Sequence, residues 1–143
     1  MSVKFYNEDV PSPKIKKRDI SVWIKEAVSE EKKNLGDINF IFCSDSYLLE
    51  VNRKYLKHDY FTDIITFDYV ENNIISGDIF ISIDRVRENS KLYNVSTMEE
   101  LRRIFIHGVL HLMGYKDKVV QEKEEMTKKE DYYLRLFEEK YLI

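Results

Sequence analysis

The sequence predicts an α+β fold in a single domain, residues 1–143, in which a small mixed sheet of about four strands packs against about five helices. Three observations support this prediction. Strand-like apolar runs occur up to residue 82, and apolar spacings of three and four residues dominate from residue 83 onward. The 143 residues include only 4 Gly and 2 Pro, which leaves little room for a linker. We expect the helices to pack on one face of the sheet.

The first half of the chain contains two helical patterns between strand patterns. Residues 3–6 resemble a short first strand. Apolar residues recur at three and four between residues 17 and 34, which predicts an amphipathic helix stopped by Gly36. The apolar run 38–43 is typical of a buried strand. Ser44 and the two residues after it offer caps for a second helix.

The second half begins with a hairpin and then becomes helical. Two strand patterns flank residues 71–73, a loop of hairpin length. Ser96 and Glu99 are spaced as a capping box at the start of a helix that continues to Gly114. The predicted strands are 64–69 and 74–82, and the predicted helices are 83–92, 96–114 and 120–141.

Composition and charge limit the classes of protein to which the chain can belong. The net charge is −3, so the chain has no global attraction to nucleic acid, and RNA binding must be local. The densest basic stretches are 14–18, 53–58 and 102–103, and we expect each to be solvated surface. Cys43 is the single cysteine, which fits a reducing cytoplasm. The sequence lacks a signal segment and an apolar run near 18 residues, so we expect neither secretion nor membrane spanning.

A candidate metal site lies near the end of the penultimate helix. His107 and His111 are four residues apart, which places them on the same helical face. Gly114 can end the helix in a left-handed turn and return Asp117 as a third ligand. Three ligands leave a position for water, as in catalytic zinc sites, and metzincin proteases use the same spacing on their metal helix. The alternatives are two hydrogen-bonded core histidines, and an aspartate that only caps the last helix.

The absence of two kinds of residue from the site argues against two kinds of zinc chemistry. Zincin proteases place a glutamate directly after the first histidine, where this chain has Gly108. Zinc-dependent base deaminases need further cysteines, and the chain has only Cys43. A metal that lowers the pKa of its water and polarises a phosphoryl oxygen needs neither group. Phosphodiester cleavage therefore remains open to this site.

Residues 107–115 resemble the signature of the YbeY family of bacterial rRNA maturation endoribonucleases, and residues 51–67 and 77–82 agree with that family in order and spacing. The resemblance covers most of the chain from the second strand onward. It implies a zinc-dependent endoribonuclease for single-stranded RNA, acting in 16S rRNA 3′ end maturation and ribosome quality control. It also implies one zinc ion per chain, the small ribosomal subunit as partner and a cytoplasmic location. We expect a monomer.

The resemblance assigns His107, His111 and Asp117 as zinc ligands, although the family usually has histidine at the third position. A carboxylate is still a competent ligand, but its charge should make the ion a weaker acid toward its water. The family also commonly has arginine where this chain has Leu56. Arg53 and Lys57 are therefore the substrate-binding candidates. Lys57 and His58 are weak catalytic candidates beside a metal-bound water, and the general base is unassigned.

Two further expectations and two rival hypotheses complete the interpretation. The exposed edge of the strand 77–82 would lie beside the metal and guide an extended substrate, and Thr62 and Asp63 would order the loop before the preceding strand. A rival hypothesis is a non-catalytic ribosome assembly or RNA-binding factor, in which a structural metal joins the last two helices. Another is a metal-dependent hydrolase that acts on a different substrate.

Overall fold

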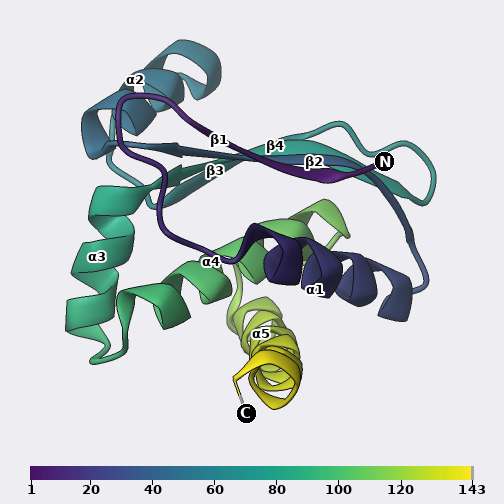
Figure 1. Cartoon of the computed structure of the whole chain (residues 1–143). Helices are drawn as coiled ribbons and strands as arrows, with labels where there is room; N and C mark the ends of the chain where they lie inside the picture. Colours follow the sequence, from purple (N-terminus) through teal and green to yellow (C-terminus); the bar gives the residue numbers. More distant parts are fainter. Residues whose placement is uncertain (143) are drawn as a thin grey trace.

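The computed structural model describes residues 1–142, and its strands and helices follow the predicted order closely (Figure 1). The strands are β1 (Val3–Asn7), β2 (Asn34–Cys43), β3 (Ile64–Asp68) and β4 (Ile74–Ser82). The helices are α1 (Lys17–Glu30), α2 (Asp45–Leu56), α3 (Ile83–Leu92), α4 (Thr97–Leu112) and α5 (Val120–Tyr141). The predicted α+β class and mixed sheet are confirmed.

The four strands form one sheet in the order β1-β2-β4-β3. β1 pairs parallel with β2 and β2 pairs parallel with β4, whereas the hairpin partners β3 and β4 are antiparallel. β4 therefore lies between two strands and has no free edge. The expectation that residues 77–82 offer an exposed edge to a substrate was wrong, because both sides of β4 make ladder hydrogen bonds. The strand at that end of the sheet is β3.

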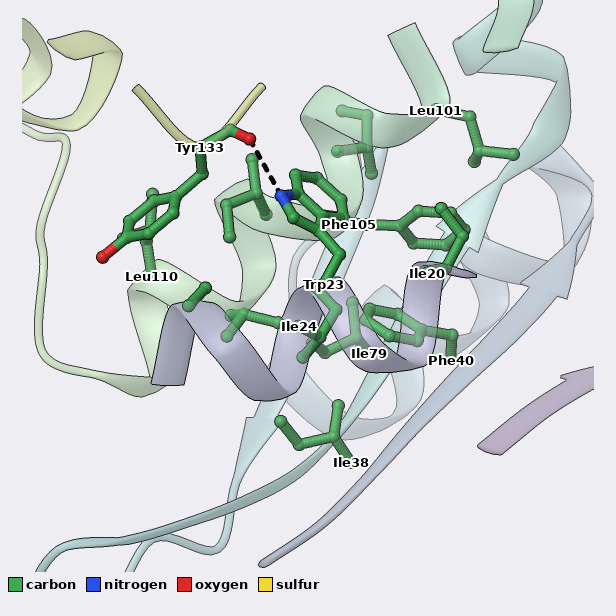
Figure 2. Packing of buried hydrophobic residues seen from close by; sticks show 14 of the residues in the cluster. Ile20, Trp23, Ile24, Ile38, Phe40, Ile79, Leu101, Phe105, Leu110 and Tyr133 are labelled. Atoms are coloured by element: carbon green, nitrogen blue, oxygen red, sulfur yellow. Dashed lines mark hydrogen bonds between the residues drawn. The ribbon is translucent and has the colours of Figure 1, made fainter. Parts of the chain in front are cut away.

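Helices cover both faces of the sheet, which corrects the prediction of a single covered face (Figure 1). The main core lies between the sheet and α1, α4 and α5, and it includes Trp23, Phe40 and Phe105. Figure 2 shows the Trp23 indole, whose Nε1 donates a hydrogen bond of 2.8 Å to the Tyr133 carbonyl oxygen and so links α1 to α5. On the opposite face α2 buries a small second cluster, which consists of Cys43, Leu48, Val51 and Ile65.

The end of α1 differs from the prediction. The helix stops at Glu30 instead of residue 34, and Lys32 adopts a left-handed conformation with φ 61°. Asn34 already belongs to β2, where it pairs with Ile74, and Gly36 lies inside that strand. Sheet pairing with a distant strand therefore ends the helix before Gly36 is reached.

α4 runs through the core and sets the position of the histidines. Ser96 begins the helix, since its hydroxyl accepts the Glu99 N–H at 3.1 Å. Gly108 lies against the sheet, where an added Cβ would come within 2.9 Å of Ile64 Cδ1. The small residue thus allows α4 to approach β3 and β4 closely. After Leu112 the chain reverses at Gly114, whose φ of +103° favours glycine.

Candidate metal centre

The structure brings His107, His111 and Asp117 together at the end of α4. The Nε2 atoms of the two histidines are 3.0 Å apart, and Asp117 Oδ2 lies 3.4 Å from the first and 3.3 Å from the second. Tetrahedral zinc with bonds of about 2.0–2.1 Å requires ligand atoms about 3.3 Å apart. The three atoms therefore lie at distances suited to three corners of a metal tetrahedron. The cluster could bind a metal ion.

Hydrogen bonds on the far side of each ring orient both imidazoles. His107 Nδ1 is 2.5 Å from the carboxylate oxygen Oε2 of Glu130, and His111 Nδ1 is 3.0 Å from the Tyr115 carbonyl oxygen. Because both partners are acceptors, each neutral ring carries its proton on Nδ1 and directs the Nε2 lone pair toward the other ring. Two lone pairs 3.0 Å apart repel each other unless a cation or a shared proton lies between them. The donor set fits a metal ion.

Glu130, on α5, is part of this arrangement although sequence analysis did not identify it. Its side chain is buried and accepts from Arg103 Nη1 at 2.8 Å, and the same guanidinium donates to Asp131 at 2.7 Å. Arg103 is thus engaged in ion pairs, and the expectation that it is simply solvated was wrong. One sequence signal pointed to Glu130: it falls in the apolar register of α5, between Met126 and Tyr133.

The charges around His107 favour a positive charge on or beside its imidazole ring. Burial lowers the pKa of His107, but the hydrogen bond to Glu130 and the nearby charges of Glu130, Asp117 and Asp63 outweigh it, so that the pKa is raised overall. The same negative charges would stabilise a bound cation. Carboxylate–histidine–metal arrangements of this kind increase the basicity of the ligating nitrogen.

A cavity of about 560 Å³ opens beside two of the candidate ligands, His107 and Asp117. Asp63, Glu100 and Glu130 add carboxylates to its lining, and Arg103 adds a guanidinium. Burial raises the pKa of Asp63, and Asp117 adds to the rise while His107 opposes it. Burial raises the pKa of Glu100 to about 7, although Arg103 acts in the opposite direction. The cavity is a concave, charged site next to the candidate metal ligands.

Asp117 does not cap α5, which was the alternative role considered for it. The Glu122 carboxylate accepts the N–H groups of Lys118 and Val119 at the start of that helix, at 3.2 and 3.1 Å. Within the described residues 1–142, the polar contacts of the Asp117 side chain go to His107 and His111. The geometry therefore favours a ligand role for Asp117.

The other predicted site residues are not part of the candidate metal cluster. Arg53 pairs with Glu50 and Asp59, Lys57 ends α2 in a left-handed conformation, and His58 stacks on Tyr60. Within residues 1–142, none of these three candidates lines the cavity. Asp63, which was expected only to order the loop, does line it.

The family model and the similar sequences name the same family. The family model described as Endoribonuclease YbeY matches residues 5–138. A protein of Parabacteroides distasonis named Endoribonuclease YbeY is 51% identical over 139 residues, covering 97% of this chain and 98% of the relative. A Bacteroides fragilis protein of the same name is 48% identical over 136 residues, covering 95% and 98%. The solution structure of TM1509 from Thermotoga maritima is similar, with a TM-score of 0.70, 26% identity and coverage of 97% and 91%.

Proposed function

The chain belongs to the YbeY family of endoribonucleases and is an RNA-cleaving hydrolase; from that premise we propose that it uses one zinc ion to cut single-stranded RNA. The proposed ligands are His107, His111 and Asp117. The observation that supports them best is the convergence of the two Nε2 atoms, 3.0 Å apart, with the Asp117 carboxylate completing the triangle. Residues 1–143 would act as one catalytic domain.

The residues around the ligands have separable roles in this proposal. A bound zinc ion would supply an activated water and polarise a phosphoryl oxygen. Glu130 holds the His107 ring in the orientation that directs Nε2 to the ion, and Arg103 holds Glu130. The general base stays unassigned, since Lys57 and His58 do not line the cavity.

The proposed substrate is ribosomal RNA. The relatives named Endoribonuclease YbeY support an RNA substrate. The proposal of 16S rRNA 3′ end maturation and ribosome quality control on the small subunit rests on the resemblance of residues 107–115 to the family signature. We place this activity in the cytoplasm and expect a monomer. Among residues 1–142, no helix combines the length and apolar character needed to cross a membrane.

Elemental analysis of untagged protein tests the metal site first. We expect about one zinc per chain in the wild type and in His58→Ala, and loss of the metal in His111→Ala. His58 is a matched control because it is the third histidine of the chain and lies outside the ligand cluster. If all three proteins lack metal after zinc is supplied, the assignment of the ligands is wrong.

Cleavage of a single-stranded RNA and of its duplex tests the activity of the zinc-loaded protein. We expect the single strand to be cut and the duplex to be spared. Attack by water should leave products without a cyclic phosphate at the 3′ end. A 2′,3′-cyclic phosphate would contradict attack by water. If zinc binds and raises the melting temperature but no RNA is cut, the structural metal of a ribosome assembly factor becomes the better explanation.

A further inference from the structure

Large aromatic side chains are exposed on the segment that leads from α2 to β3. Tyr55, Tyr60 and Phe61 are 59%, 55% and 51% exposed. Single exposed apolar residues are ordinary on a protein surface, but here three aromatic rings occur within seven residues. The proposed catalytic chemistry uses none of them. We refer to residues 55–61 as the aromatic segment.

The aromatic segment is anchored to its surroundings by hydrogen bonds. Asn52, which is buried in α2, donates from Nδ2 to the Tyr60 carbonyl oxygen at 2.9 Å. The carbonyl oxygen of Asn52 accepts the His58 N–H at 3.1 Å. Just beyond the segment, the Ser82 N–H donates to the Asp63 carbonyl oxygen at 3.0 Å. The exposed rings are thus presented from a backbone whose position is set before any ligand arrives, which lowers the entropic cost of binding.

Basic side chains accompany the rings. Lys54 Nζ lies 5.3 Å from the centre of the Tyr55 ring, and the Arg85 guanidinium lies 5.1 Å from that of Phe61. The His58 ring stacks on Tyr60 with centres 5.2 Å apart and an angle of 22°. Proteins that bind single-stranded nucleic acid combine aromatic faces for the bases with cations for the backbone. The composition of the aromatic segment fits this class of ligand.

Acidic side chains pair with two arginines beside the aromatic segment. Arg53 pairs with Glu50 and Asp59, and Arg85 pairs with Asp45 at 3.1 Å. These pairs reduce the positive charge that is available to phosphates. Binding at this surface must therefore depend on the ring faces more than on charge.

The aromatic segment adjoins the cavity. Phe61 is two residues from Asp63, whose side chain lines the cavity together with His107 and Asp117. Two residues span at most about 7 Å of extended chain. A strand held at Phe61 would therefore lie near a residue that lines the cavity.

We propose that the aromatic segment is a stacking platform for the bases of single-stranded RNA next to the bond that is cut, with Tyr60 and Phe61 as the main contacts. This inference rests on the proposed function. Stacking is tolerant of sequence, because every base has a flat face. Duplex RNA has its bases stacked internally and cannot use the platform.

Steady-state cleavage by the zinc-loaded enzyme tests the platform. Stacking contributes about 1–3 kcal/mol per base, so Tyr60→Ala and Phe61→Ala should each raise KM roughly 5- to 150-fold and leave kcat nearly unchanged. Tyr60→Phe and Phe61→Tyr keep an aromatic ring and should restore the wild-type KM. Tyr69→Ala is the matched control, because Tyr69 is equally exposed but follows β3 at its far end.

Abasic substrates provide a second measurement that needs no variant. RNAs with one base removed at successive positions should show a raised KM at one or two positions beside the cut. At those positions Phe61→Ala or Tyr60→Ala should add no further increase. If the wild type cuts RNA but KM is unaffected by the alanine variants or by every abasic position, the platform is refuted while the endoribonuclease stands. If the wild type cuts no RNA, the proposed function itself fails.

Discussion

Glu100 offers a quantitative test of how burial changes the ionisation of a side chain that lines the cavity. It lies in the first turn of α4, is 4% exposed and lines the cavity. Burial raises its pKa from 4.5 to about 7, and the charges of Asp63 and Glu130 add to the rise while Arg103 opposes it. The ionised form is therefore less favourable in the folded protein than in the unfolded chain. The substitution Glu100→Gln removes the ionisation and nearly preserves the shape.

The sign and size of the effect follow from linkage. The folded state holds the Glu100 proton more tightly, so the stability contribution of this group is present below pH 4.5 and is lost as the pH rises to about 7. Each pKa unit corresponds to about 1.4 kcal/mol, which gives a loss of about 3 kcal/mol above pH 7. Glu100→Gln should avoid that loss. At pH 8 the variant should be about 3 kcal/mol more stable than the wild type, whereas near pH 4 the two should be equal.

Urea denaturation from pH 4 to pH 8, in the presence of a chelator, measures this difference. Comparing the two proteins at each pH cancels the titration of groups that both retain. Glu124→Gln is the control, because it removes the same charge from an exposed position on α5. A stability gain that is the same at every pH would refute the reasoning, as would a gain that is largest at pH 4.

Two further predictions concern the ligand sphere and the packing of the sheet. Glu130→Gln removes the charge that faces His107 Nδ1 and should weaken zinc binding about 10- to 100-fold in a chelator competition assay. Glu130→Asp should weaken zinc binding less. If wild type and Glu130→Gln bind zinc with equal affinity, Glu130 does not position His107. Gly77→Ala would place Cβ 2.6 Å from the Phe67 carbonyl oxygen and should cost about 1–3 kcal/mol in urea denaturation. Gly108→Ala should cost less, because its close contacts are side-chain methyl groups and alanine favours the helix by about 1 kcal/mol. A larger loss at Gly108 would contradict this order.

Most of the fold could be predicted because local patterns determine it. Helices α3 and α5 begin and end at the predicted residues. Their bounds depend on the apolar spacing within each helix and on the residues directly beside it, which are all local in the sequence. The end of α1 could not be predicted, because it depends on the pairing of Asn34 with Ile74, 40 residues away. The position of α2 on the opposite face depends likewise on the strand order β1-β2-β4-β3, which no local pattern contains.

The same distinction applies to the site. His107, His111 and Asp117 lie within eleven residues, so helix periodicity and one glycine turn suffice to bring them together. Glu130 approaches His107 from another helix, 23 residues later, and its role depends on how α5 packs against α4. A glutamate in the apolar register of an amphipathic helix is nevertheless a signal that can be recognised, because an unpaired buried carboxylate is costly.

The negative charge of the cavity links the proposed metal ligands to the proposed role of the aromatic segment. Five carboxylates line the cavity, against the Lys123 ammonium and an Arg103 guanidinium that is already paired with two acids; the five belong to Asp63, Glu99, Glu100, Asp117 and Glu130. A phosphodiester entering that cavity meets negative potential unless a dication offsets it. The proposed zinc ion thus matters for admitting the phosphate as well as for activating water. A chain with net charge −3 gains little further attraction for RNA from its surface, so ring faces beside the cavity are the physically consistent source of affinity for the rest of the strand.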